Sequence, residues 1–322
     1  MNDKAVRIIL SVVLVLVLPW VAVKIIGRDN KVQINEEHAT PDVLPATSEA
    51  LVKEERIAVM LADGDTKWLS LEEYILGVIM CEMPADFELE ALKAQAVVAR
   101  TYAMRREASG EKHIGAAVCT SAACCQGYTS PERYGGDAQD VEKLRKAVEG
   151  TAGLVLLYNG ELIDATYYSC SGGRTEDALA VWGADIPYLQ SVSSPGEEGA
   201  THYMDTVTCT VDEFQYLLGR TLSGPSETWF GKVTYTEGGG VETMEIGGQL
   251  YEGTRLRQIL DLRSTAFIIN SVGNTVTITT KGYGHRVGMS QYGADAMAKE
   301  GSNFTKILEH YYSGAKVSSL FA

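Results

Sequence analysis

Basic side chains are scarce in this sequence: 28 lysines and arginines face 42 aspartates and glutamates, and the formal net charge is −14. Nucleic acids and anionic membrane surfaces attract proteins that carry a basic footprint, so this balance disfavours nonspecific attraction to either. It still leaves room for a local basic groove. We expect no nucleic-acid partner, and a hydrophobic content of 45% over 322 residues is ample for a folded core.

The chain also lacks a convincing cleavage site after its long apolar run. Residues 8–26 (IILSVVLVLVLPWVAVKII) carry a single charged residue, Lys24, and a membrane-spanning helix needs roughly 17 to 25 apolar residues. Without a small-residue cleavage motif, such a run favours a retained anchor over a cleaved signal peptide. Basic residues flank both of its ends, so the positive-inside rule assigns no orientation. We expect a transmembrane anchor within residues 1–28.

The remaining chain divides into a polar segment and a long patterned one. Residues 29–56 hold two prolines and few large apolar side chains, which is typical of an exposed linker. Helical and strand-like patterns are mixed from residue 57 to residue 322. We therefore expect one α+β domain over residues 57–322.

A helix with an unusual last turn is predicted near the start of this domain. The run from Ser70 to Glu73 fits a capping box, in which the serine hydroxyl and the glutamate satisfy free amides at the start of a helix. Apolar residues follow at helical spacing through Ile75 and Val78, and the next position on that stripe is Glu82. A carboxyl group is thus expected on the buried face.

Two features of this position are expected to raise the pKa of Glu82. Pro84 cannot continue the helix, so the glutamate lies near its last turn, where unpaired carbonyls make the potential negative. Partial burial acts in the same direction, and a raised pKa is what a general acid at neutral pH requires. A nearby Lys93 or Arg100 would lower the pKa instead, and spacing alone favours a structural pairing of Glu82 with one of these cations over catalysis.

Two glycine-rich segments follow in the second half of the chain. Residues 154–176 contain two strand-like runs around Asn159-Gly160, a strong hairpin signal. The amides and hydroxyl of residues 171–173 either line a polar ligand or form an ordinary turn. Residues 265–301 indicate two strands, a glycine-rich loop with His285, and a helix, and this histidine either holds backbone or transfers protons.

Taken together, three segments resemble the stage II sporulation protein D family. They are EYILGVIMCEMPADFELEALKAQAVVARTYAMR, then SGGRTE followed by VWG and PYLQSV, and finally GYGHRVGMSQYGADAMA followed by ILEHYYSGA. They occur in the order and approximate spacing of that family, and the resemblance covers nearly all of residues 57–322. It implies a peptidoglycan lytic transglycosylase with a substrate cleft, which cuts between N-acetylmuramic acid and N-acetylglucosamine and forms a 1,6-anhydro sugar.

The resemblance also assigns residues. The catalytic glutamate of the family precedes Met-Pro and corresponds to Glu82. Hydrolysis of a glycoside usually needs two carboxylates, but a transglycosylase needs one, because the 6-hydroxyl of muramic acid takes the place of water. Lys93, Gln95 and Arg100 could hold sugar hydroxyls or the lactyl group, or serve the structure. The family motifs place five further residues near the cleft: Ser171, Thr175, His285, Ser290 and Gln291.

Two residues depart from the family pattern. Arg286 stands where many relatives have glycine, and Cys170 lies in a stretch that is usually rich in serine. These departures affect the expected shape of the cleft and leave the role of Glu82 unchanged.

A possible metal site lies between these segments. His113, Cys119 and Cys125 are each six residues apart, and an imidazole with two thiolates suits zinc. From spacing alone, a disulfide from Cys119 to Cys124 or Cys125 is equally expected. Clostridial relatives carry a zinc site that this segment resembles, which implies structural Zn²⁺ with Cys124, water or a substrate group as fourth ligand. Two further cysteines, Cys81 and Cys209, have no assigned role.

The resemblance implies partners and a location as well. Single-anchor members of the family act during engulfment, on the mother-cell membrane facing the forespore, with the catalytic domain outside the cytoplasm. They prefer denuded glycan and work with a membrane-anchored partner that strips peptides. The same domain occurs in amidase enhancers, which leaves a glycan-binding regulator as the alternative function, and a wall-tethering module as a third. The anchor, Glu82 and the zinc-like cluster favour the enzyme.

Overall fold

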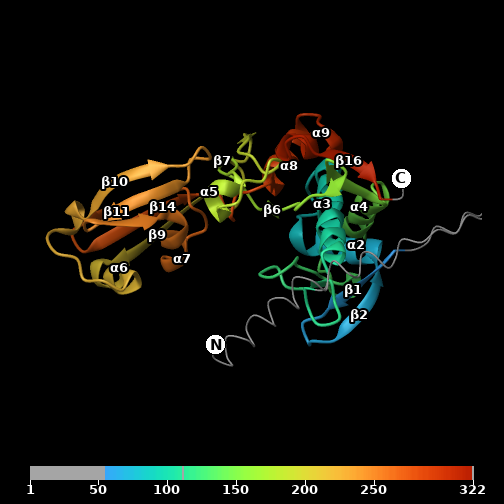
Figure 1. Ribbon diagram of the computed structural model, residues 1–322, viewed down its shortest axis with the longest axis horizontal. Coiled ribbons are helices and arrows are strands. Elements are labelled where there is room, and N and C mark those ends of the chain that lie inside the picture. The colour runs from blue at the N-terminus through green and yellow to red at the C-terminus, as the bar shows by residue number, and fades with distance from the viewer. Residues whose placement is uncertain (1–54, 111, 321–322) are drawn as a thin grey trace, which may run out of the picture. The chain divides into compact units, whose positions relative to one another are not determined.

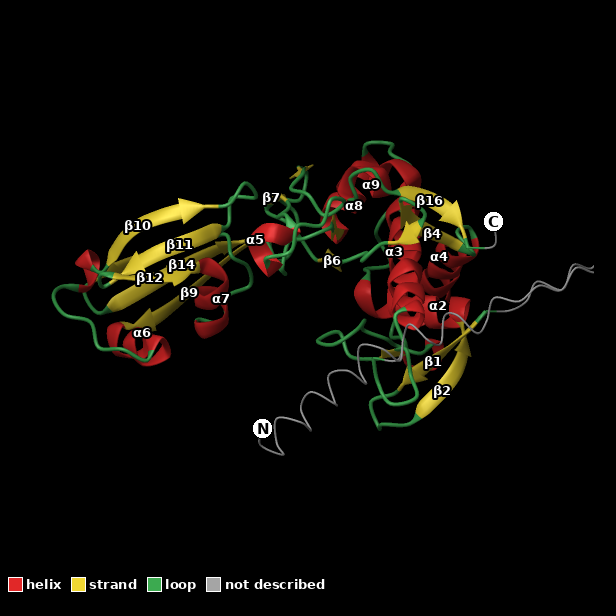
Figure 2. Ribbon diagram, in the orientation of Figure 1, coloured by secondary structure: helices red, strands yellow, loops and turns green. Residues whose placement is uncertain are grey.

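The computed structural model describes residues 55–110 and 112–320. The expected anchor and nearly all of the expected linker lie outside these residues. Among the described residues, no helix is both long and apolar enough to cross a membrane. Helices and strands are interspersed along the described chain (Figure 2), which confirms the predicted α+β class. Residues 53–322 form one compact unit.

The first elements form a hairpin followed by two helices. Strand β1 (Arg56–Met60) pairs antiparallel with β2 (Thr66–Ser70), and the short β3 (Val118–Cys119) joins β1 in parallel. Helix α2 (Leu71–Glu82) begins at the predicted capping box, in which Glu73 donates its amide to the Ser70 hydroxyl and accepts from the Ser70 amide. The helix ends at Glu82, two residues before Pro84, as predicted.

Helix α3 (Leu89–Ala108) is the central element of the first hydrophobic core (Figure 1). Five of its six alanines are fully buried, and these small side chains allow close contact with α2, α4 (Ala138–Glu149), α8 (Gln291–Lys299) and α9 (Phe304–Tyr311). It also contacts a small sheet in which β4 (Leu154–Tyr158) lies between β5 (Glu161–Leu162) and β16 (Lys316–Ser319).

The predicted hairpin around Asn159-Gly160 is confirmed. Tyr158 pairs with Glu161 across a two-residue turn. Both turn residues have positive φ values, 52° for Asn159 and 85° for Gly160, which is the conformation that a type I′ turn requires and that Asn-Gly adopts readily.

Short pairings connect segments that are far apart in the sequence. Strand β6 (Tyr167–Tyr168) runs parallel to β15 (Met289–Ser290), and β7 (Gly173–Arg174) pairs antiparallel with β8 (Ser193–Ser194). Helix α5 (Ala178–Trp182) follows β7, and the 3-10 turn η1 (Pro131–Arg133) lies between β3 and α4 in the chain. The β6–β15 pairing brings the two glycine-rich segments of the sequence together.

A second hydrophobic core is formed by residues 211–278. One sheet has the order β13 (Phe267–Val272), β14 (Thr275–Lys281), β9 (Met204–Thr210), and the other consists of β10 (Phe230–Tyr235), β11 (Val241–Ile246) and β12 (Gln249–Glu252). Helices α6 (Val211–Leu218) and α7 (Gly253–Ile259) and the 3-10 turn η2 (Ser226–Thr228) accompany them. Burial alternates along β13, so one face of its sheet faces this core. The strand pair predicted near the C-terminus is confirmed by β13 and β14.

Candidate active site

Glu82 is the last residue of α2, and its side chain is partly buried. Its Oε1 atom accepts a hydrogen bond of 2.6 Å from the Gly127 amide. A Cβ atom at Gly127 would lie 2.9 Å from this oxygen and 2.7 Å from the Cys81 sulfur. Glycine at this position therefore allows the backbone to approach the carboxyl group closely enough to donate to it.

The carboxyl group faces a cavity of about 350 Å³. The cavity is lined by aromatic, hydroxyl, amide and backbone groups. Its lining residues are Glu82, Tyr102, Ala122, Cys125, Ala165, Thr166, Tyr167, Tyr168, Ser169, Tyr283, Gly284, His285 and Gln291. Within this set Glu82 is the one carboxyl group, and the cavity has the mixed polar and apolar lining typical of a ligand site.

Burial raises the pKa of Glu82 above its ordinary value, while hydrogen bonds from the Gly127 amide and the Tyr167 hydroxyl act to lower it. The direction agrees with the sequence-based expectation. Burial dominates because the carboxylate loses more hydration than these two donors replace. The carboxyl group thus stays protonated to a higher pH than an exposed glutamate.

The two cations considered as partners of Glu82 lie elsewhere. Arg100 is fully buried in α3, where its guanidinium forms an ion pair of 2.5 Å with Glu72 and donates to the Leu154 carbonyl at 3.1 Å. Lys93 pairs with Glu90 at 2.7 Å. Neither side chain lines the cavity. The Arg100 contacts join α3 to α2 and β4, the Lys93 pair lies within α3, and both fit a structural role.

The remaining predicted contact in α3 is Gln95. Its side chain is fully buried, and neither atom of its amide has a hydrogen-bond partner among the described residues. It does not line the cavity.

Ser171 and Thr175 are buried and hold the backbone of the SGGRTE segment. The Ser171 hydroxyl donates to the buried carboxylate of Glu197 at 2.9 Å, and the Ser171 and Gly172 amides donate to the same carboxylate. The Thr175 hydroxyl accepts from the Val192 amide at 2.8 Å. Both residues support the wall of the site and lie outside the lining of the cavity.

Two of the residues predicted near the C-terminus do line the cavity, and a third supports it. Gln291 donates from Nε2 to the backbone carbonyl of Glu82 at 3.1 Å, and so ties the start of α8 to the end of α2. Ser290 caps α8 through the Gly293 amide at 3.1 Å. His285 is the remaining member of this group and lines the cavity itself.

His285 is held as a neutral imidazole. Burial lowers its pKa to about 4, the nearby Arg257 acts in the same direction, and a hydrogen bond with the Tyr167 backbone opposes them. Its Nδ1 atom accepts from the Val287 amide at 3.1 Å. The ring packs against Tyr168 and Trp182. These contacts fix the orientation of the imidazole in the wall of the cavity.

Arg286, the first departure from the family pattern, has a φ of 66°. This left-handed conformation favours glycine and costs other residues on the order of 1 kcal/mol. The buried guanidinium offsets the cost, because it pairs with Glu176 at 3.2 Å and donates to the carbonyls of Ser171, Arg174 and Gly238. The second departure, Cys170, is buried, and burial raises the pKa of its thiol to about 11.

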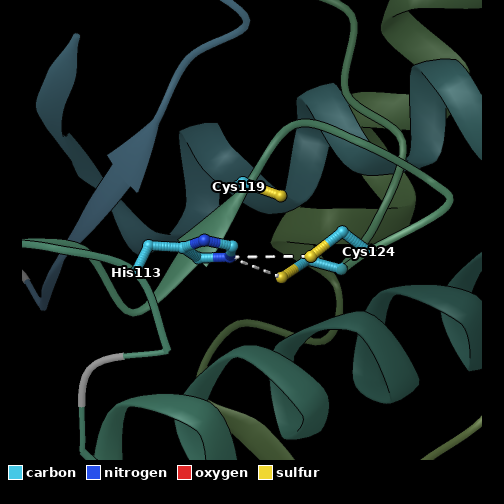
Figure 3. Close-up of side chains that lie close together, drawn as sticks. His113, Cys119 and Cys124 are labelled. Atoms are coloured by element: carbon cyan, nitrogen blue, oxygen red, sulfur yellow. Dashed lines mark hydrogen bonds between the residues drawn. The ribbon is translucent and has the colours of Figure 1, made fainter. Parts of the chain in front are cut away.

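The predicted metal ligands lie together, and Cys124 joins them (Figure 3). The ligand atoms of His113, Cys119, Cys124 and Cys125 all lie within 4.8 Å of one another. The His113 Nε2 atom is 3.3 Å from the Cys125 sulfur and 3.9 Å from the Cys124 sulfur. All six cysteines are free. Three sulfurs and one imidazole at these separations fit the tetrahedral Cys₃His set of structural zinc sites.

This cluster adjoins the cavity along the chain. Cys125 is a member of both, and the next two residues are Gln126 and Gly127, the second of which donates to Glu82. The amide that contacts the carboxyl group therefore lies two residues from the last cysteine of the cluster.

Among the site residues that sequence reasoning did not identify are Gln126, Gly127, Tyr167 and Tyr168. The signal that could have found the first two is their place directly after the last cysteine of the cluster. The two tyrosines carry no such signal, because only the pairing of β6 with β15 brings them to the cavity.

The structure is thus an α+β domain in which one carboxyl group faces a cavity and a cluster of soft metal ligands lies beside it. A profile described as Stage II sporulation protein matches residues 64–158. The stage II sporulation protein D of Bacillus amyloliquefaciens is 38% identical over 321 residues, which cover 95% of this chain and 93% of that protein. That of Bacillus subtilis (strain 168) is 41% identical over 266 residues, or 80% of this chain and 77% of that protein. The chain belongs to the stage II sporulation protein D family.

A second kind of relative is also similar. The amidase enhancer of Bacillus subtilis (strain 168) is 30% identical over 297 residues, which cover 76% of this chain and 40% of that protein. The domain thus occurs in proteins with two different descriptions.

Proposed function

We propose that this protein is a peptidoglycan lytic transglycosylase that uses Glu82 as its single acid and base. The observation that carries the proposal is that, among the described residues lining the cavity, Glu82 is the one carboxyl group, with a raised pKa. A glycosidase of the usual kind requires a second carboxylate beside the scissile bond. A transglycosylase does not, because its nucleophile belongs to the substrate.

The reaction has two steps. In the first, Glu82 gives its proton to the glycosidic oxygen, the bond from this oxygen to C1 of the muramic acid breaks, and the bonding electrons stay on the oxygen. In the second, the 6-hydroxyl of the same muramic acid forms a bond to C1, and its proton returns to the Glu82 carboxylate. Water is not consumed, and the glutamate ends in its starting state.

The protein side chains support both steps. The raised pKa increases the fraction of Glu82 that carries the proton needed for the first step. The Gly127 amide and the Tyr167 hydroxyl donate to the carboxylate that forms. Gln291 fixes the backbone of Glu82, and the neutral His285 adds no charge to the cavity wall.

We further propose that His113, Cys119, Cys124 and Cys125 hold one structural Zn²⁺. The donor set fits zinc, and four protein ligands leave no open position for a substrate. The metal would fix residues 113–127 as a unit, and this segment contains the amide that donates to Glu82. The sequence-based prediction named three of these ligands and left the fourth open, and the cluster supports Cys124 as the fourth.

We also propose that the protein acts in engulfment during sporulation, on the outer face of the mother-cell membrane and anchored by residues 8–26. Membership of a sporulation family supports this setting. Similarity to an amidase enhancer supports a functional link with a peptidoglycan amidase, whose removal of stem peptides would supply the denuded glycan strands that the enzyme cuts.

The second candidate function is a glycan-binding enhancer of such an amidase, without chemistry of its own. The similarity to the amidase enhancer favours it. The two candidates differ in a simple respect, because an enhancer releases nothing from glycan when its amidase is absent.

The test is cleavage of amidase-treated glycan strands by the purified full-length protein and its Glu82→Gln variant. Glutamine keeps the size of the side chain but cannot give or take the proton, so we expect cleavage to fall by about 10² to 10⁴, or more because the residue acts twice. Glycan affinity is expected to stay near wild type.

Glu142→Gln is the matched control, since Glu142 is exposed on α4 and its loss should leave cleavage unchanged. Substantial activity in the Glu82→Gln variant would contradict the assigned role. A wild-type protein that binds glycan and releases no product would favour the enhancer.

A further inference from the structure

Tyr167 reaches the cavity from a strand that no local sequence pattern marks. It lies in β6, where its backbone pairs with Met289 of β15. Its side chain lines the same cavity as Glu82, and the two side chains are hydrogen-bonded. The tyrosine is thus a neighbour of the proposed acid through a contact between segments 85 residues apart in the sequence.

The direction of this hydrogen bond follows from a second contact. Gln126 donates from Nε2 to the Tyr167 oxygen at 3.3 Å. A phenol has one proton to donate and can accept with its lone pairs. Since Tyr167 accepts from Gln126, its own proton is free to point to the carboxyl group of Glu82.

Gln126 is itself held in this orientation. Its side chain is buried, and its Oε1 atom accepts from the Tyr74 hydroxyl at 3.3 Å. Tyr74 is fully buried in α2 and stacks on Tyr128 with a centroid separation of 5.9 Å. Every donor in the series Tyr74, Gln126, Tyr167 therefore points toward Glu82.

Tyr128 is fixed in turn by a glycine of α2. A Cβ atom at Gly77 would lie 2.2 Å from the Tyr128 ring, so the ring packs directly on the helix backbone. The series begins on α2 at Tyr74 and returns to α2 at Glu82. Between these two residues it passes through Gln126, in the loop that follows the cysteines, and through Tyr167.

We propose that Tyr167 is a positioning residue of the transglycosylase reaction, whose hydroxyl donates to the Glu82 carboxyl group, aims it at the glycosidic oxygen and stabilises the carboxylate between the two steps. Gln126 orients this hydroxyl. The inference rests on the proposed function and adds residues that act through Glu82. Burial and the nearby Glu82 hold the pKa of Tyr167 well above its ordinary value, so the phenol remains a donor throughout.

The test compares Tyr167→Phe with wild type on soluble, peptide-free glycan chains, using the full-length protein. Phenylalanine keeps the ring and removes the hydroxyl, and with it both the hydrogen bond to the Glu82 carboxyl group and the one accepted from Gln126. Because the first of these is made to a charged group, we expect kcat to fall about 10- to 100-fold. KM is expected to stay within about twofold, because the hydroxyl acts on the acid and not on the sugar. Gln126→Leu should lower kcat in the same direction by a smaller factor.

The matched control is Tyr188→Phe. This substitution also removes a tyrosine hydroxyl, which accepts a hydrogen bond from the Asp164 amide at 3.1 Å. Tyr188 does not line the cavity. Its kcat should equal that of wild type. A similar fall in all three variants would show a general loss of structure and would overturn the inference.

The outcomes distinguish failure of the role of Tyr167 from failure of the proposed transglycosylase function. If Glu82→Gln is inactive while Tyr167→Phe and Gln126→Leu keep the wild-type kcat, the inference is wrong and the proposed function stands. A change confined to KM would also overturn it, since that would place Tyr167 on the substrate. If wild type itself cuts no glycan, both proposals are overturned.

Discussion

Glu82 acquires its raised pKa through burial, and the cations that the sequence offers as partners are used elsewhere. Arg100 forms its ion pair with Glu72, and Lys93 forms its own with Glu90. Helical spacing predicted the buried face and the direction of the pKa shift correctly. It could not predict that Arg100 meets Glu72, because that contact depends on how α2 and α3 pack. The Lys93–Glu90 pair is a local contact within α3, three residues apart.

His285 gives a prediction for stability against pH. Its pKa falls from 6.5 to about 4 on folding, so between these values the unfolded chain binds a proton that the folded protein does not. The contribution of the neutral histidine to stability is complete above pH 6.5 and is lost as the pH falls toward 4. In His285→Asn, the Asn oxygen can accept from the Val287 amide in place of Nδ1 and does not titrate.

Urea unfolding of both proteins at pH 7 and pH 4 measures this effect. The stability of wild type relative to His285→Asn should decrease by about 3 kcal/mol between the two pH values. Taking the difference between the proteins removes the contribution of other titrating groups. A difference that stays constant with pH would show that the imidazole is not held neutral.

Elements defined by local signals were predicted well, and those defined by distant pairings were not. The capping box of α2, the Asn-Gly hairpin and the β13–β14 pair each depend on residues close in the sequence. The β6–β15 pair joins segments more than a hundred residues apart through two residues on each side. A pairing of two residues is too short to show a periodic pattern in the sequence. The place of Tyr167 and Tyr168 in the site could therefore not be predicted.

The segment from His113 to Gly127 supports a prediction about metal. We expect one zinc per chain in the full-length protein and its loss in Cys119→Ser. Because metal binding is coupled to the folding of such a site, the variant should melt at a lower temperature. Its cleavage activity should also decrease, since the amide of Gly127 follows the cluster.

Metal analysis and thermal unfolding provide the measurement, with Cys209→Ser as the control. Cys209 lies in β9, packs against the second core and is not part of the cluster, so its replacement should leave the metal content unchanged. Absence of zinc together with oxidised cysteines in the wild-type protein would favour the disulfide instead.

At the scale of the whole molecule, a buried ion pair connects distant parts of residues 53–322. Arg286 and Glu176 are both buried, and they contact the Gly238–Gly240 turn as well as the SGGRTE segment. Removing one partner of such a pair leaves an uncompensated charge. The sequence indicated only that Arg286, in place of glycine, would alter the cleft. The fold shows that its role is this buried ion pair.

The location of the chain is a prediction of its own. Residues 8–26 are long enough to span a membrane, and wall glycan lies outside it, so residues 57–322 should be extracytoplasmic and remain attached. A reporter at the C-terminus should be accessible to protease in protoplasts. A soluble form of reduced mass would indicate a cleaved signal peptide.

The most direct test of the central claim is the chemical nature of the new ends formed on glycan strands. Wild-type protein is incubated with peptide-free strands in oxygen-18-labelled water, and the products are analysed by mass spectrometry. If Glu82 acts alone and the muramic 6-hydroxyl is the nucleophile, the new ends are 1,6-anhydromuramic acid without label, and they are absent with Glu82→Gln. Reducing muramic ends that carry the label would contradict the account, because they would show a hydrolase with a second catalytic group.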